Sequence, residues 1–173
     1  MKNTLLPLLF TLMLSMVLVS SCKKETEDEK TQNDLIGTWN IDNSTADLSV
    51  GGVDLVTYMT TNFEYTEQEA QMLVNFFTSG IEAGNQGTIN FKDDNTYQFT
   101  NSEGVENGTW SINNDGNTLV LVYENETDNL TIVSLSSSNL KLRIPTETED
   151  IDLDDDGDNE TTVNIDMTLN LSK

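Results

Sequence analysis

The residues whose spacing is most specific for chemistry lie in an acidic stretch over residues 146–160, which contains no basic residue. Within it, aspartates stand at alternate positions before Gly157, which is the pattern of the first half of a D-x-D-x-D-G calcium-binding loop. Ca²⁺ takes about six to eight oxygen ligands, and so many carboxylates in one loop repel each other unless a cation offsets their charge. We therefore expect one Ca²⁺ ion with these protein ligands: Asp152, Asp154, Asp156, Asp158 and Glu160.

The acidic stretch departs from a complete EF-hand in two ways. Val163 stands where the bidentate glutamate belongs, and a strand pattern follows where a helix is expected. The expected calcium site is thus a loop at the tip of the last hairpin, with a dissociation constant of roughly 10⁻⁴ to 10⁻³ M. The alternative is a solvated acidic loop that protects the hairpin from aggregation.

The remaining residue types argue against catalysis. The chain has no histidine and one cysteine, which excludes Ser-His-Asp and Cys-His catalysis, histidine acid–base chemistry, disulfides within the chain and most zinc sites. A pair of carboxylates could hydrolyse a glycosidic bond, but among 30 acidic residues some pair is always present. We expect a protein that is not an enzyme.

Length and charge restrict the class of protein further. The 173 residues suffice for one domain with a real core and are too few for two domains of typical size. Thirty acidic residues against eight basic ones give a net charge of -22. A chain with this charge is repelled by nucleic acid and by anionic lipid surfaces, so we expect no nucleic-acid partner.

The N-terminal segment has the pattern of a processing signal. Lys2 precedes an almost unbroken apolar run over residues 5–19, which is too short to span a membrane as a helix. Val19-Ser20-Ser21-Cys22 then resembles a bacterial lipoprotein box, in which the cysteine is acylated and becomes the new N-terminus. We expect residues 1–21 to be removed and Cys22 to carry a lipid anchor. The alternative is an ordinary signal peptide followed by a stray cysteine.

Residues 22–34 have the composition of a flexible tether. After Cys22 they contain no apolar residue and cannot bury enough surface to offset the entropy of ordering. The lysine and acidic residues that follow Cys22 resemble the export signal of surface lipoproteins of Bacteroidetes. This resemblance implies a protein tethered to the outer membrane and exposed at the cell surface, with a folded part that starts near Leu35.

The folded part, residues 35–173, is dominated by a period of two, which indicates strands with one apolar and one polar face. Short polar turns separate the runs, so we expect eight antiparallel strands in meander order. Such strands remove their exposed edges by closing into an up-and-down barrel. The apolar residues that define them are Trp39 and Ile41; Ile89 and Phe91; Tyr97 and Phe99; Trp110 and Ile112; Leu119, Leu121 and Tyr123; Leu130 and Ile132; Leu140, Leu142 and Ile144; and Val163 to Leu171 at every second position.

One segment breaks the strand pattern. Thr66 and Glu69 form a T-x-x-E capping box, and apolar residues then repeat at helical spacing, which predicts a helix over about residues 66–82 between the first and second strands. We favour a plug or cover that packs on the barrel over a lid above a ligand cavity, since apolar helix stripes are usually core. Residues 44–65 fit either a hairpin or a short helix.

Two glycine–tryptophan motifs begin expected strands, Gly37-Thr38-Trp39 in the first and Gly108-Thr109-Trp110 in a later one. The glycine lets the backbone bend into the strand, and the tryptophan points inward, where Trp39 closes one end of the barrel. With the stretch over residues 88–99 and the Asp-Gly-x-x-Leu turn at residues 115–119, the chain resembles the lipocalin-like lipoproteins of Bacteroidetes. That resemblance implies an eight-stranded calyx and supplies no ligand.

We therefore expect a lipoprotein, tethered to the outer membrane, with a lipocalin-like calyx that binds a small apolar or amphipathic ligand. The alternative is a structural or interaction module, in which side chains fill the barrel and the function lies in the calcium-binding hairpin or a protein partner. An eight-stranded barrel is wide enough for either outcome.

Overall fold

The computed structural model describes residues 27–173 with the exception of residues 114, 155 and 160. The expected signal peptide and Cys22 therefore lie outside the described residues. The helices and strands have these bounds: α1 Glu27–Leu35, β1 Gly37–Val50, β2 Val53–Asp54, α2 Leu55–Asn62, α3 Glu67–Gly84, β3 Thr88–Phe91, β4 Thr96–Thr100, β5 Val105–Ile112, β6 Thr118–Tyr123, β7 Glu126–Leu135, β8 Asn139–Ile151 and β9 Thr161–Ser172.

The strands form one antiparallel sheet that closes on itself. Their order is β2-β1-β3-β4-β5-β6-β7-β8-β9, and β1 also pairs with β9. The eight-stranded up-and-down barrel expected from the alternation of apolar residues is thus confirmed. Strand β2 is a short addition that pairs with the end of β1.

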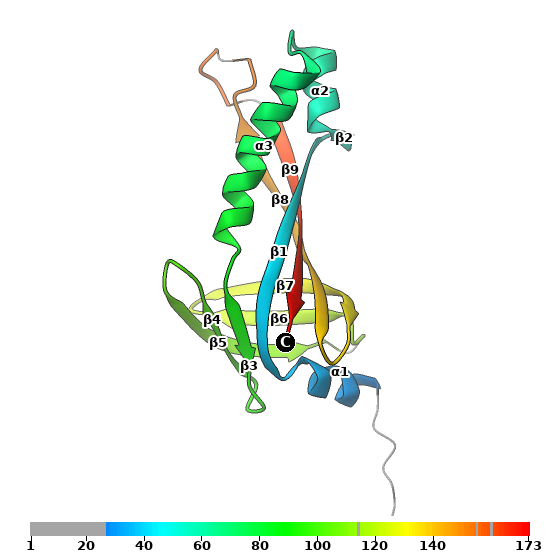
Figure 1. The fold of residues 1–173 in the computed structure, drawn as a ribbon, viewed down its shortest axis with the longest axis vertical. Coiled ribbons are helices and arrows are strands. Elements are labelled where there is room, and N and C mark those ends of the chain that lie inside the picture. The colour runs from blue at the N-terminus through cyan, green and yellow to red at the C-terminus, as the bar shows by residue number, and fades with distance from the viewer. Residues whose placement is uncertain (1–26, 114, 155, 160) are drawn as a thin grey trace, which may run out of the picture.

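Three strands continue beyond the barrel as a ribbon (Figure 1). The pairing of β1 with β3 ends at Asn40, whereas its pairing with β9 continues to Ser49, and β8 stays paired with β9 as far as Ile151. Pro145 lies within the register shift between Ile144 and Glu147. A proline lacks the N–H group of a regular ladder, so an irregularity of this kind accommodates it at the base of the ribbon.

The inserted helix lies beside this ribbon. Thr66 and Glu69 form the expected capping box, and α3 runs on to Gly84. Its apolar side chains join α2 and the ribbon in a second core, whose buried members are Leu48, Leu55, Met59, Ala70, Leu153 and Val163. Helix α3 therefore acts as a cover and not as a plug, and the strands that it covers are those of the ribbon (Figure 1).

The segment that fits either a hairpin or a short helix contains both. Strand β1 extends to Val50, and Gly51 and Gly52 turn the chain at φ values of 58° and 82°. Glycine adopts this left-handed region without strain. Strand β2 then pairs back, and Asp54 caps α2 by accepting a hydrogen bond from Thr57 N (3.1 Å).

Helix α1 differs from the flexible tether expected over residues 22–34. It docks at the end of the barrel opposite the ribbon (Figure 1), with Leu35 fully buried. Lys173 Nζ donates to the carbonyls of Asp34 (2.7 Å) and Ile36 (2.8 Å), so the last residue holds the helix in place. The folded domain thus includes residues 27–34, which sequence composition places in the tether.

Candidate functional site

The barrel interior contains an apolar cavity of about 170 Å³. Every strand from β3 to β9 and the start of β1 contribute to its wall. Most of the lining is aliphatic or aromatic, and the polar members are few: Asn85, Tyr97, Glu106, Tyr123 and Asp128. An apolar cavity with a few convergent polar groups is the typical form of a small-molecule site.

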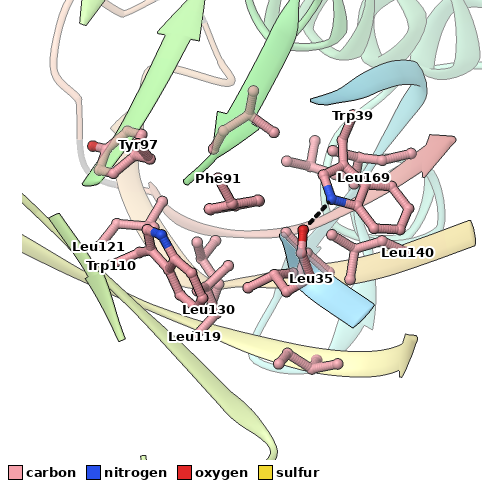
Figure 2. Packing of buried hydrophobic residues seen from close by; sticks show 14 residues of the cluster. Leu35, Trp39, Phe91, Tyr97, Trp110, Leu119, Leu121, Leu130, Leu140 and Leu169 are labelled. Atoms are coloured by element: carbon pink, nitrogen blue, oxygen red, sulfur yellow. Dashed lines mark hydrogen bonds between the residues drawn. The ribbon is translucent and has the colours of Figure 1, made fainter. Parts of the chain in front are cut away.

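Packed aromatic rings fill the barrel toward α1, and Leu35 at the end of α1 packs against them (Figure 2). Trp39 is fully buried, donates its indole N–H to the carbonyl of Leu35 (2.6 Å), and has Lys173 Nζ 4.6 Å above its ring. The expected place of Trp39, buried at one end of the barrel, is confirmed. The cavity therefore has a closed floor on the α1 side.

The second motif lies beside the β3–β4 turn. Trp110 is buried, packs edge-on against Phe91 at 5.6 Å between ring centroids, and donates its indole N–H to the carbonyl of Lys92 (3.1 Å). A side chain at Gly108 would bring its Cβ within 2.6 Å of the Tyr97 ring and 2.3 Å of the carbonyl oxygen of Val122. Gly108 therefore makes room for Tyr97, whereas the sequence suggests a backbone bend.

The first glycine has a different role. Gly37 is the first residue of β1, two residues after the end of α1, and has a φ of 132° in a region that favours glycine. A Cβ at this position would lie 3.1 Å from Cε of Lys173. The glycine thus allows the sharp exit from α1 and the close approach of the terminal lysine.

The polar groups gather at the mouth of the cavity, on the side away from α1. The Tyr97 hydroxyl donates to Glu106 Oε1 (2.5 Å), and the Tyr123 hydroxyl donates to Glu126 Oε2 (3.0 Å). Burial raises the pKa of Tyr97 far above its usual range, and the hydrogen bond to Glu106 raises it further. Burial and the hydrogen bond to Glu126 likewise raise the pKa of Tyr123, with Asp128 contributing. Both hydroxyls keep their protons at neutral pH.

Strand phase explains why carboxylates line an apolar cavity. Glu106 shares the inward face of β5 with Gly108 and Trp110, and Asp128 shares the inward face of β7 with Leu130. Asp128 is the cross-strand partner of Leu121, which also lines the cavity. The inner face therefore changes from apolar to acidic over the last layer of side chains.

The acidic loop lies at the far end of the ribbon. Oxygens of Asp152, Asp154 and Asp156 come within 4.8 Å of one another, which matches ligands around one Ca²⁺ ion at roughly 2.4 Å each. Gly157 N donates to Asp152 Oδ2 (2.9 Å) and thereby closes the loop. Asp158 stays outside this group, and Glu160 lies outside the described residues.

The loop is attached to the second core through Leu153. This side chain is buried, and its carbonyl accepts a hydrogen bond from the Tyr65 hydroxyl (3.0 Å). A fixed residue between Asp152 and Asp154 limits how far these two carboxylates can separate. The backbone between the first two aspartates of the triad is thus anchored to the second core.

The sequence predicts the barrel and the acidic triad but misses the polar mouth. Glu106 and Asp128 stand two residues before an inward-facing glycine and leucine, so the period of two does place them inside. Acidic residues are mostly exposed in proteins, so residue type does not mark these two as cavity residues. None of the helices in the described part of the chain has the length and hydrophobicity of a membrane-spanning helix.

A match to a known protein family agrees with the barrel. A family model described as a lipocalin-like domain (DUF4923) matches residues 11–150, and this match ends before the acidic loop. A crystal structure of a DUF4847 family protein from Bacteroides vulgatus ATCC 8482 is similar at 16% identity and a TM-score of 0.34, over 75% of this chain and 90% of that one. No curated protein sequence matches the chain.

Proposed function

Since the chain belongs to the lipocalin-like domain family DUF4923, we propose that it is a lipoprotein whose barrel binds a small apolar or amphipathic ligand. The cavity above the packed floor is the observation that carries this proposal. An engineered apolar cavity of about 150 Å³ stays dry and binds benzene, so 170 Å³ suits one ring or a branched alkyl group. The function is binding and not catalysis.

The place of α1 supports a particular orientation on the outer membrane. Helix α1 begins five residues after Cys22, so an acylated Cys22 keeps the closed end of the barrel within about 18 Å of the anchor. The mouth and the ribbon lie at the opposite end and face away from the lipid. A ligand then enters from the aqueous side.

Native mass spectrometry of protein purified from its own host tests the ligand. We expect a retained small molecule in the natural chain and its loss in Leu121→Trp, which places a larger side chain in the cavity wall. A circular dichroism spectrum equal to that of the natural chain controls for folding. An empty barrel in every preparation favours the structural module with a filled interior.

The lipid anchor is tested separately. Cys22→Ala should release the protein from the membrane fraction, because no other cysteine is available for acylation. If the variant remains bound to the membrane, the anchor is not at Cys22.

We also propose that the acidic loop binds Ca²⁺, supported by the convergence of Asp152, Asp154 and Asp156. A ligand present at a hundredfold excess over its dissociation constant stabilises the folded state by about 2.7 kcal/mol. Millimolar calcium should therefore raise the melting temperature above that in chelator, and Asp154→Asn with Asp156→Asn should abolish the rise. Magnesium should act weakly, because its octahedral shell accepts fewer carboxylates. Identical melting curves in calcium and chelator leave a solvated acidic loop.

A further inference from the structure

The polar groups at the cavity mouth offer hydrogen-bond acceptors almost exclusively. Carboxylates of Glu106 and Asp128 accept and do not donate. The Tyr97 and Tyr123 hydroxyls already direct their single protons to Glu106 and Glu126. A ligand at this mouth must therefore supply donors.

Asn85 extends the same pattern from the C-cap of α3. Its side-chain nitrogen donates to the carbonyl of Ile81 (2.8 Å) and to Met167 Sδ (3.1 Å). The side-chain amide nitrogen of Asn85 is thus engaged, and its amide oxygen is another acceptor in a residue that lines the cavity.

The negative charge at the mouth has no basic partner nearby. Glu106 and Asp128 line the same cavity, and the charges of both help to raise the pKa of the Tyr97 hydroxyl. Among the described residues that line the cavity, none is a lysine or an arginine. The basic residues of the described strands and turns lie elsewhere. Lys141 and Arg143 are on the outward face of β8, Lys92 is in the β3–β4 turn, and Lys173 contacts the end of α1.

We propose that the ligand is a small amphipathic cation, with a hydrophobic group of about one ring in the cavity and a primary ammonium group between the carboxylates of Glu106 and Asp128. This inference rests on the proposed ligand-binding function. An ammonium group supplies three donors and one positive charge, which matches a mouth of acceptors and uncompensated carboxylates. The apolar wall disfavours a bare metal ion, because it offers no oxygen ligands below the mouth.

Calorimetry at neutral pH with three probes of similar size and different charge tests whether the ligand is a cation. A chelator is present so that no metal ion binds to the acidic loop. The probes are 2-phenylethylamine, the neutral 2-phenylethanol and the anionic 3-phenylpropionate. We expect the amine to bind at least about tenfold more tightly than the alcohol, since hydrogen bonds to charged groups exceed neutral ones by that factor. The anion should not bind measurably, and added salt should weaken only the amine.

Two variants locate the effect. Glu106→Gln and Asp128→Asn should each reduce the affinity for the amine about tenfold and leave the affinity for the alcohol unchanged. Asp93→Asn removes the same charge from the exposed β3–β4 turn at the closed end, and it should change neither affinity.

The outcomes distinguish this inference from the function on which it rests. Two results would overturn the inference of a cationic ligand and leave a barrel that binds some other ligand. One is equal affinity for the amine and the alcohol, and the other is an amine affinity that Glu106→Gln and Asp128→Asn do not change. Absence of binding by all three probes to the folded protein overturns both, provided that native mass spectrometry also finds the barrel empty.

Discussion

At the residue scale, the space over Gly108 is occupied by the ring of its cross-strand partner Tyr97. This position lets the Tyr97 hydroxyl reach Glu106 at the mouth. The glycine is therefore required by packing against a neighbouring strand, and not by its own backbone angles. The absence of a side chain at Gly108, the glycine of the second G-x-W motif, thus allows Tyr97 to contribute its hydroxyl to the polar end of the cavity.

We expect Gly108→Ala to destabilise the protein by about 2 kcal/mol or more, because the new Cβ meets the Val122 carbonyl, which cannot rotate away. Gly80→Ala is the matched control. Gly80 lies in α3 with nothing within 4 Å of a new Cβ, and alanine there should stabilise by about 1 kcal/mol. Urea denaturation measures both values, and equal effects of the two substitutions would contradict the packing role.

The raised pKa of Tyr97 predicts a dependence of stability on alkaline pH. Its pKa is higher in the folded state than in the unfolded state, where it is near 10, so the unfolded chain loses its proton first. The contribution of Tyr97 is complete below pH ~10 and is lost as the pH rises further, by at most about 1.4 kcal/mol per pH unit. Tyr97→Phe should make this decline shallower, as denaturation at a series of pH values would show. An unchanged slope would mean that Tyr97 ionises equally in both states.

At the scale of elements, α1 is an example of a structure that local sequence patterns do not predict. The barrel strands are predictable because each one alternates within its own segment. Helix α1 has almost no apolar residue, and its contact with Lys173 joins positions 139 residues apart, which no local pattern reports. The acidic mouth is missed for another reason, since the period of two places Glu106 and Asp128 on the inward face but acidic residues are usually exposed.

The terminal lysine should control the docking of α1. Lys173→Met removes two hydrogen bonds and the cation above Trp39, and we expect a loss of stability of about 1 kcal/mol together with faster hydrogen exchange in α1. The matched control is Lys141→Met, which also removes one positive charge but at an exposed position of β8 away from α1. It should leave exchange in α1 unchanged, and equal effects of the two variants would assign the result to net charge.

At the scale of the whole molecule, two separate cores share three strands. The barrel core contains Trp39, Phe91 and Trp110, while the ribbon core is smaller and contains Met59 and Ala70 under two largely exposed helices. Strands β1, β8 and β9 belong to both. Every strand of the ribbon, which carries the acidic loop, is therefore also a barrel strand. Strands β4 to β7, in contrast, pair only within the barrel.

This sharing of strands predicts unequal responses to damage in the two cores. Met59→Ala leaves a void in the ribbon core and should speed hydrogen exchange in α2 and α3 while β5 to β7 stay protected, because regions with fewer buried contacts open at lower free energy. Trp39→Ala should cost about 3 to 5 kcal/mol and speed exchange everywhere, since each ribbon strand is also a barrel strand. Exchange that rises uniformly in Met59→Ala would show that both cores unfold as one unit. In that case a calcium ion bound at the acidic loop would also stabilise the distant barrel, and protection of β5 to β7 would increase with calcium.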